Sequence, residues 1–316
     1  METLNFGPLI QSKADSTVGL IVPKWYYPKS DLMRSPSILG GYSYDREQNS
    51  LRQAAAFGRD LALRMNEIPN TAKLSSLCIS VAIIQMRRFF LVNRLSDYDP
   101  RDVITSTMFL ASKSEECPRR LKDLVLCFYR LKVEVDCPKD LWELNSKLDK
   151  KTYEHVAAYL VWLENVILQT TGFDFNVEVP HPFVLKMCET FFPDDHLPRE
   201  IGFWLATDSL HMTDWSVRYR PETVACIVIF VMVMWKEVDI PTIRVVVNGE
   251  TLTKRFFDVK CELSYGELLD ITNEYTEILK ENQSNRLLAI TKYRDAEIRQ
   301  KTELNTSKNE REPGEI

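Results

Sequence analysis

The run Val224-Ala-Cys-Ile-Val-Ile-Phe-Val-Met-Val-Met-Trp235 decides the fold class of this chain. A membrane-spanning helix needs about 20 apolar residues, and this run is much shorter. A helix that is apolar on every side needs apolar partners all around it. Pro221 precedes the run and suits the first turn of a helix. We therefore predict a helix buried at the centre of a helical domain.

Most other segments also carry apolar residues at helical spacing. In the first of these segments, residues 45–65, Gly58 is the one residue that disfavours a helix. Ser264 and Glu267 have the spacing of a capping box, in which each side chain binds the other residue's free backbone amide. We predict helices over 45–65, from a cap at Thr71 through 89, over 103–111, from Pro118 through 128, over 155–171 with Gly172 as terminator, and over 182–192, 198–212, 221–236 and 264–280.

Three stretches lack this helical spacing. Residues 133–151 mix a proline with charges and predict a long connection. Residues 242–252 are rich in valine before Asn248-Gly249, which predicts an extended loop or a hairpin on the helical body. From residue 293 the charges alternate in sign and aromatic residues are absent after Tyr293, so we expect a polar, disordered tail.

Length and composition narrow the function classes. A chain of 316 residues is long enough for two domains with separate cores. Its formal net charge of −5 gives no basic excess for binding a nucleic-acid backbone. Only 10 glycines disfavour a turn-rich all-β fold, and seven cysteines without a CxxC pair favour a reducing, intracellular environment. The first twenty residues predict no secretory signal, and no segment predicts a membrane helix.

Catalytic and metal-binding patterns are not evident. The four histidines lie far apart, without an HExxH motif or a Cys/His pair at zinc-finger spacing. The sequence also has no glycine-rich phosphate loop and no GxSxG motif. We therefore expect no catalytic residues, no metal and no cofactor.

Two pairs of similar short segments suggest that the two halves of the chain are related. Lys113-Ser-Glu-Glu-Cys-Pro118 and Lys236-Glu-Val-Asp-Ile-Pro241 each follow a predicted buried helix. Leu163-Glu-Asn-Val-Ile-Leu168 and Tyr275-Thr-Glu-Ile-Leu279 each lie late in their half. The two pairs are offset by different distances, so we interpret the chain as a duplicated helical unit with unequal loops.

A series of motifs resembles the transcriptional cyclins, most of all cyclin T, with cyclin K next. The resemblance spans residues 24–292, and its motifs keep one order. Two departures from cyclin T are Arg87, where relatives usually have His, and Phe256-Phe257, where they have a Trp pair. The motifs are Trp25-Tyr26-Tyr27, Ser35-Pro36-Ser37, Arg52-Gln53-Ala54-Ala55, Arg88-Phe89-Phe90, Phe109-Leu-Ala-Ser-Lys113-Ser-Glu-Glu116, Ile167-Leu-Gln-Thr-Thr-Gly-Phe173 and Ala206-Thr-Asp-Ser-Leu-His211.

The resemblance implies an all-α protein with two tandem five-helix cyclin folds and an N-terminal helical arm. The expected boundaries are 1–24 for the arm, 25–175 for the first cyclin fold (the cyclin box), 176–292 for the second and 293–316 for the tail. It also implies a nuclear regulatory subunit that binds and activates a transcriptional cyclin-dependent kinase. Such a complex phosphorylates the C-terminal repeats of RNA polymerase II and promotes transcription elongation, and the kinase performs the catalysis.

The family resemblance assigns kinase contact to three residues: Lys113, Glu116 and Glu164. Glu164 is the only formal charge between Glu154 and Asp174. Without the resemblance, an internal salt bridge or a solvated edge explains Glu164 better than a kinase contact does, because a buried charge needs a partner. Lys113 is likewise explained by the negative end of a helix dipole. The family assignment places the Lys113 ammonium against kinase carbonyls beside Glu164, with Glu116 at the rim.

Three further residues, Arg52, Arg88 and Phe89, are expected to support the structure through packing and charge pairing. Two other function classes stay open at this point. One is a promoter-binding general transcription factor of the TFIIB type, which would need a basic face and an N-terminal zinc ribbon. The other is an all-helical enzyme with a site assembled from scattered residues. The partner expected from the resemblance is a kinase, with no membrane and no direct nucleic acid.

Overall fold

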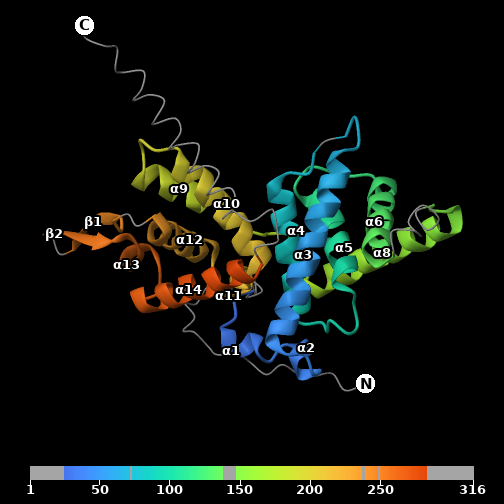
Figure 1. The fold of residues 1–316 in the computed structure, drawn as a ribbon, viewed down its shortest axis with the longest axis horizontal. Coiled ribbons are helices and arrows are strands. Elements are labelled where there is room, and N and C mark those ends of the chain that lie inside the picture. Colours follow the sequence, from blue (N-terminus) through green and yellow to red (C-terminus); the bar gives the residue numbers. More distant parts are fainter. Residues whose placement is uncertain (1–24, 72, 138–146, 237–238, 248–249, 283–316) are drawn as a thin grey trace, which may run out of the picture.

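The computed structural model describes residues 25–71, 73–137, 147–236, 239–247 and 250–282, which form two helical bundles side by side (Figure 1). This architecture confirms the all-α class with tandem halves. The expected arm at 1–24, the tail at 293–316 and residues 138–146 of the expected connection at 133–151 lie outside the described residues. Among the described helices, none is long and apolar enough to cross a membrane.

The first bundle surrounds helix α5, as its uncharged sequence predicts. Ile104 and Met108 of α5 have no exposed surface. Two short helices, α1 (Lys29–Leu32) and α2 (Pro36–Leu39), precede the bundle. The bundle consists of α3 (Tyr44–Asn66), α4 (Ser76–Phe90), α5 (Pro100–Ser114), α6 (Leu121–Asp136) and α8 (Lys150–Thr170).

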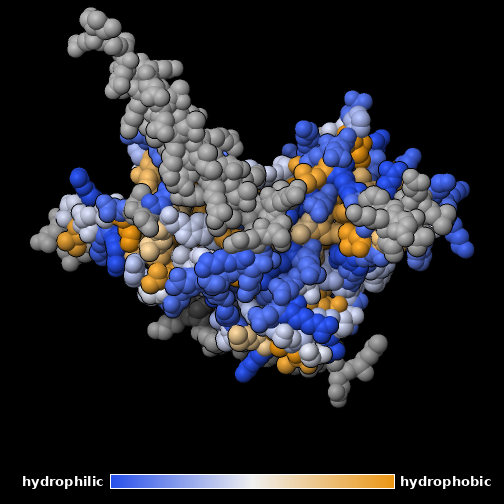
Figure 2. Space-filling model, viewed as in Figure 1, coloured by the Kyte–Doolittle hydropathy of each residue, from blue (hydrophilic) through white to orange (hydrophobic). Residues whose placement is uncertain are grey.

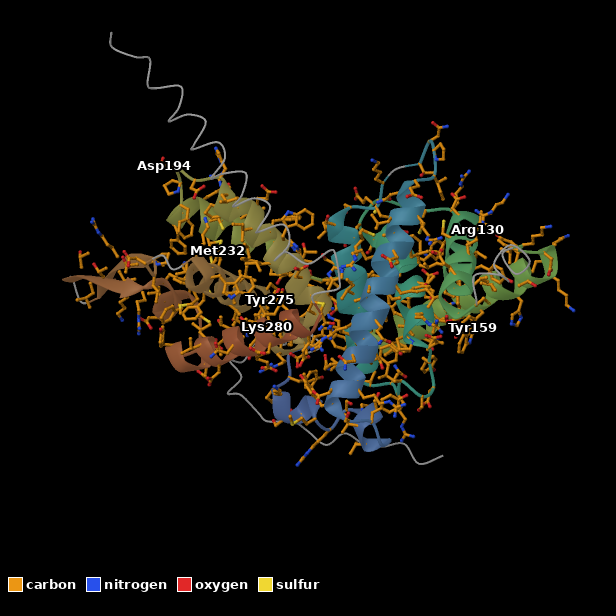
Figure 3. All side chains as sticks on the ribbon, viewed as in Figure 1. Arg130, Tyr159, Asp194, Met232, Tyr275 and Lys280 are labelled. Carbon is orange, nitrogen blue, oxygen red and sulfur yellow. The ribbon has the colours of Figure 1, made fainter. Side chains whose placement is uncertain are left out.

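The second bundle surrounds α12, and every residue from Val224 to Val233 is buried. The predicted central helix is therefore confirmed, and Met232 of α12 and Tyr275 of α14 both point into this core (Figure 3). The elements are α9 (His181–Phe191), α10 (Leu197–Met212), α11 (Trp215–Arg218), α12 (Pro221–Lys236), β1 (Thr242–Val247), β2 (Glu250–Arg255), α13 (Phe256–Lys260) and α14 (Tyr265–Glu281).

Helix starts were the least accurate predictions, because side-chain caps decide them. Ser75, not Thr71, caps α4: its hydroxyl accepts the Cys78 amide at 3.1 Å. Asp99 caps α5, which begins three residues earlier than predicted, at Pro100. Asp149 caps α8, which begins at Lys150 instead of residue 155. In each case the helix begins directly after the residue whose side chain caps it, and not at the start that the apolar spacing predicted.

Other boundaries also differ from the prediction. Helix α6 begins at Leu121, so Pro118 lies outside its first turn, and it continues to Asp136, into the stretch expected to be a connection. The extended stretch is a two-stranded antiparallel hairpin in which Val245 pairs with Leu252, and it runs on to Arg255. The capping box of Ser264 and Glu267 is confirmed.

The C-terminus of α10 joins the two bundles. Its last carbonyls have no partner within the helix, as at any helix end. Arg87 of α4 donates to the carbonyls of Leu210 at 3.3 Å and His211 at 3.2 Å. Arg52 of α3 donates to the carbonyl of Met212 at 2.7 Å. Two cations of the first bundle therefore cap the negative end of a second-bundle helix.

Neighbouring contacts extend this junction. Leu210 belongs to the first hydrophobic core although it lies in α10. Tyr44 donates to Asp214 at 2.6 Å, just beyond the end of α10. The amide of Tyr27 donates to the carbonyl of Val217 at 2.8 Å. The proposed boundary between residues 175 and 176 falls between α8 and α9, before the chain reaches this junction.

Gly58, the weak position in the helical pattern, lies where α3 crosses α5. A Cβ atom at this residue would stand 2.5 Å from Cγ1 of Ile104, which is fully buried. Cγ1 is close to the backbone and cannot swing away without moving α5. The absence of a side chain therefore allows the close approach of two helices.

We expect Gly58→Ala to lower the free energy of unfolding by about 1–2 kcal/mol, because overpacking outweighs the usual helix-propensity gain. Gly266 of α14 is the matched control, since a Cβ there meets nothing within 4 Å. Gly266→Ala should leave stability unchanged or raise it. Urea unfolding of both variants checks this, and a Gly58→Ala protein as stable as the parent would contradict the packing argument.

Candidate functional site

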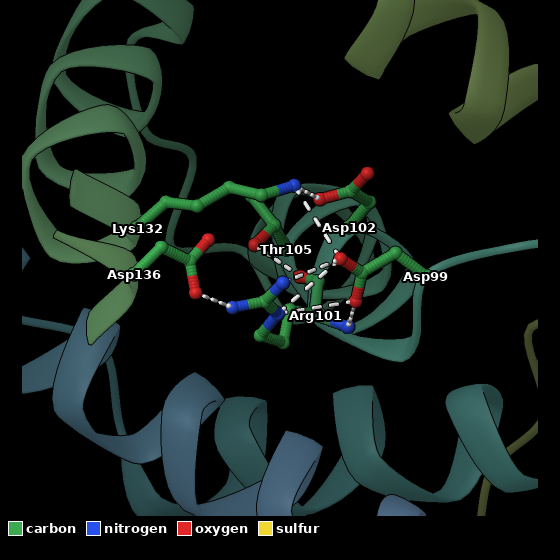
Figure 4. Close-up of polar contacts among 6 residues, drawn as sticks. All are labelled: Asp99, Arg101, Asp102, Thr105, Lys132 and Asp136. Atoms are coloured by element: carbon green, nitrogen blue, oxygen red, sulfur yellow. Dashed lines mark hydrogen bonds and ion pairs between the residues drawn. The ribbon is translucent and has the colours of Figure 1, made fainter.

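Helix α5 is fixed at its N-terminus by a cluster of ion pairs (Figure 4). Arg101 binds Asp99 at 2.9 Å and Asp136 of α6 at 2.6 Å. Lys132 of α6 binds Asp102 at 2.6 Å. Because the pairs join the start of α5 to the end of α6, they hold the central helix in position along its axis.

The pKa values of the Asp99 and Asp102 carboxyl groups are shifted in opposite directions. Burial raises the pKa of Asp99, but hydrogen bonds from the Arg101 side chain and amide outweigh it, and the net pKa is lowered. Burial dominates for Asp102 and raises its pKa, although Lys132 opposes the shift. Asp99 is therefore the more firmly ionised of the two, as its additional role as the cap of α5 requires.

Lys113 and Glu164 meet at the other end of α5. The Lys113 ammonium, in the last turn of α5, forms an ion pair with Oε1 of Glu164 in α8. The Lys113 side chain is 43% exposed, and the Glu164 side chain is 8% exposed. The structure thus brings together two residues whose spacing in the sequence alone could not show that they meet.

Both members of this pair keep unused hydrogen-bonding capacity. Among the described residues, Oε1 of Glu164 accepts no hydrogen bond of ordinary geometry. It interacts with the Lys113 ammonium through the ion pair. An ammonium has three donors and a carboxylate accepts several bonds. The Lys113 nitrogen also lies 4.2 Å from the centre of the Phe109 ring, which favours a cation. The pair can therefore offer donors and acceptors to the backbone of a partner.

Residues close to Lys113 and Glu164 in the sequence include partly exposed apolar side chains and two positions with a left-handed backbone. Val161 and Leu168 of α8, on the same helical stripe as Glu164, are only partly buried. Glu116 is exposed with φ of 55°, and Phe173 is 59% exposed with φ of 58°. A left-handed backbone at a residue other than glycine is costly and often marks a functional loop. Within the described part of the chain, Glu116 makes no ion pair.

Arg52, Arg88 and Phe89 lie away from this pair. Arg52 binds the end of α10, as described above. Arg88 binds Asp174 at 3.4 Å, and its guanidinium lies 5.1 Å from the centre of the Trp25 ring. Phe89 has no exposed surface and meets Phe90 and Tyr98 edge to face. These contacts support the structural role that we propose for all three residues.

Sequence reasoning missed Arg87, Asp174 and Phe173 as individual residues. Asp174 accepts from the Trp25 indole at 2.7 Å, besides pairing with Arg88. A charge that is isolated in the sequence, such as Asp174, could have indicated a buried partner. Arg87 stood out only as a departure from relatives, and Phe173 only as part of a motif.

A shallow cavity of about 460 Å³ separates α3 from α14. Arg52 and Tyr44 line its first-bundle side, and Glu274 and Glu277 line the α14 side. Hydrophilic side chains cover this face of α14 (Figure 2). The cavity therefore lies in the polar boundary between the bundles and away from Lys113. Within the described ranges, no group of three His, Cys, Asp or Glu side chains has the arrangement of a metal site.

Comparison with known proteins finds two family matches in tandem. Residues 43–176 match the family described as cyclin, N-terminal domain. Residues 179–278 match the family described as Cyclin-T2-like, C-terminal domain. The junction between the matches falls where the first bundle gives way to the second.

Individual relatives agree with this assignment. The chain is 31% identical to human Cyclin-T1 over 280 residues, 88% of this chain and 35% of that protein. It is 32% identical to Cyclin-T1.1 of Caenorhabditis elegans over 69% of this chain and 45% of that protein. It thus spans about a third to a half of the length of these relatives. The yeast RNA Pol II CTD kinase CTDK-1 complex contains a chain of similar fold, with TM-score 0.60 and 15% identity over 80% of this chain and 74% of that one.

The unequal exposure of Lys113 and Glu164 predicts unequal costs of breaking their pair. Lys113→Met leaves a buried carboxylate without a cation and should cost about 2–4 kcal/mol of unfolding free energy. Glu164→Gln leaves an ammonium that can turn into water, so it should cost less than about 1 kcal/mol. Chemical unfolding of both variants measures the difference. Equal costs, or the reverse order, would show that the pair is arranged differently.

Proposed function

The chain belongs to the cyclin family, and we propose that it is a regulatory subunit that binds and activates a cyclin-dependent kinase of the transcriptional class. The observation that carries this proposal is the pair of family matches. The first bundle matches the cyclin N-terminal domain, and the second bundle matches the Cyclin-T2-like C-terminal domain. A factor of the TFIIB type would also have paired cyclin folds, but the net charge of −5 and the T-type second half disfavour it.

The finer proposal concerns the substrate. We propose that the complex phosphorylates the C-terminal repeats of RNA polymerase II in the nucleus and so promotes transcription elongation. Similarity to T-type cyclins across both halves supports it. The chain of similar fold in a complex named as an RNA polymerase II tail kinase agrees with it at the level of fold.

The proposed mechanism is stabilisation of one kinase conformation. Phosphoryl transfer by a kinase requires its Lys–Glu ion pair and its metal-binding Asp to be in register, and the position of its αC helix controls that register. A partner that binds only the active arrangement shifts the equilibrium toward it. The chain would supply no catalytic group, and we expect no kinase activity from it alone.

We propose the exposed ends of α5 and α8 as the kinase-binding surface. Lys113 can donate to kinase carbonyls while it remains paired with Glu164, because its ammonium has donors to spare. Glu116 can accept a bond at the rim, and the partly buried Val161 and Leu168 offer apolar area beside the charges. An apolar patch around a few well-placed polar groups is the usual anatomy of a specific interface.

The activation proposal is tested with a reconstituted complex. A kinase identified by mass spectrometry of proteins that copurify with the chain is mixed with a polymerase-tail peptide, with and without the purified chain. We expect phosphorylation at least about tenfold faster with the chain, which corresponds to roughly 1.4 kcal/mol. The chain alone should transfer no phosphate. Equal rates with and without the chain, or phosphate transfer by the chain alone, would refute the proposal.

The same complex tests the surface. Glu164→Gln should weaken kinase binding about tenfold or more, while Glu154→Gln, on the same helix with a 63% exposed side chain, should leave it unchanged. Isothermal titration measures both affinities. Binding of Glu164→Gln within about threefold of the parent would remove this end of α8 from the interface and leave the activation proposal standing.

A further inference from the structure

Two free cysteines of the second bundle lie against each other. Cys226 is in α12 and has no exposed surface, and Cys261 directly follows α13 and is partly exposed. The Cys226 thiol donates a hydrogen bond to the carbonyl oxygen of Lys260, the residue before Cys261, at 3.5 Å. The two thiols also interact directly, with Cys226 as the donor when Cys261 is ionised. The two sulfurs are therefore neighbours, although 35 positions separate them in the sequence.

The surroundings give the two thiols different chemistry. The Cys226 hydrogen bond lowers the pKa of Cys261; burial opposes this shift, and the amides of Leu263 and Glu262 add to it. The hydrogen bond to Cys261 and burial raise the pKa of Cys226. Cys261 is thus the thiol that ionises first, and it is also the one that solvent reaches. An accessible thiolate next to a second thiol is the arrangement of a redox-sensing pair.

We propose that Cys261 and Cys226 form a peroxide-sensitive pair, with Cys261 as the attacking thiolate and Cys226 as the resolving thiol. The Cys261 sulfur attacks one oxygen of a hydroperoxide, the O–O bond breaks, and the leaving oxygen takes a proton from water. Cys261 becomes a sulfenic acid. The Cys226 sulfur then attacks the Cys261 sulfur, the S–O bond breaks, and water leaves. Two thiols are oxidised to one disulfide, and one peroxide is reduced.

The resulting bond would clamp a defined part of the fold. It would tie the end of α13 to α12, the central helix of the second bundle. The closed loop would contain the hairpin β1–β2. The Ser264 capping box that starts α14 lies only three residues beyond Cys261. Oxidation should therefore reduce local opening between the hairpin and α14 without rearranging the core.

The test uses the full chain and hydrogen peroxide. After treatment, remaining thiols are blocked and the digested protein is analysed by mass spectrometry. We expect a Cys226–Cys261 disulfide, loss of two of the seven free thiols, and full recovery with dithiothreitol. Hydrogen exchange of the oxidised protein should slow in residues 250–263. Each variant is used only after circular dichroism shows the parent helix content.

Three variants assign the roles. Cys226→Ala should accumulate sulfenic acid at Cys261, trapped by dimedone, because the resolving thiol is gone. Cys261→Ser should give neither a disulfide nor a dimedone adduct at Cys226. Cys117→Ser is the control, since the partly exposed Cys117 interacts with the buried Cys78, and its loss should leave oxidation of the Cys226–Cys261 pair unchanged within about twofold.

Several outcomes would overturn the proposal. Dimedone labelling of Cys226 in place of Cys261 would reverse the roles. Oxidation spread equally over all cysteines would show no selective pair. If Cys261 stays reduced at a peroxide dose that oxidises other cysteines, the pair is structural only.

Discussion

The contact between Arg87 and the end of α10 is the interaction on which the joining of the two bundles depends. A helix end leaves carbonyls without partners and carries partial negative charge. Arg87 supplies donors to two of these carbonyls, and Arg52 supplies one to a third. Burial lowers the pKa of Arg87 to about 10, which still leaves it charged at neutral pH. His211 is buried beside it, and burial lowers the pKa of His211 to about 4, so no second cation competes there.

A fixed junction gives the proposed kinase-binding surface a rigid support. The helix that carries Arg87, α4, packs against α5, and α5 packs against α8. The cluster around Asp99 and Arg101 fixes one end of α5, and the pair of Lys113 and Glu164 lies at the other end. A rigid platform loses little conformational entropy when a partner binds, so more of the contact energy appears as affinity.

Local patterns in the sequence predicted most of the fold. Apolar spacing located the long helices, the capping box at Ser264 was visible directly, and the valine-rich stretch before Asn248-Gly249 indicated the hairpin. Helix starts failed where Ser75 and Asp99 provide caps, because capping strength depends on local geometry that periodicity does not contain.

Long-range contacts were beyond prediction from spacing. Nothing local pairs Lys113 with Glu164 or Arg87 with residues more than a hundred positions away. The resemblance nevertheless contained this information indirectly. Trp25, Arg52 and His211 belong to its motifs, and all three lie in contacts between distant segments. Arg52 and His211 lie in contacts that join the bundles, so part of the family pattern records this junction. The stretch from Phe109 to Glu116 and the residues near Glu164 concern the proposed partner.

The most direct test of this account is the unfolding free energy of Arg87→Met. The substitution keeps an unbranched apolar chain but leaves the carbonyls of Leu210 and His211 without charged donors, so we expect a loss of about 2–4 kcal/mol. Arg130→Met, at an exposed position on α6, should change stability by less than about 0.5 kcal/mol. If Arg87→Met also stays within that range, Arg87 does not hold the bundles together and the account is wrong.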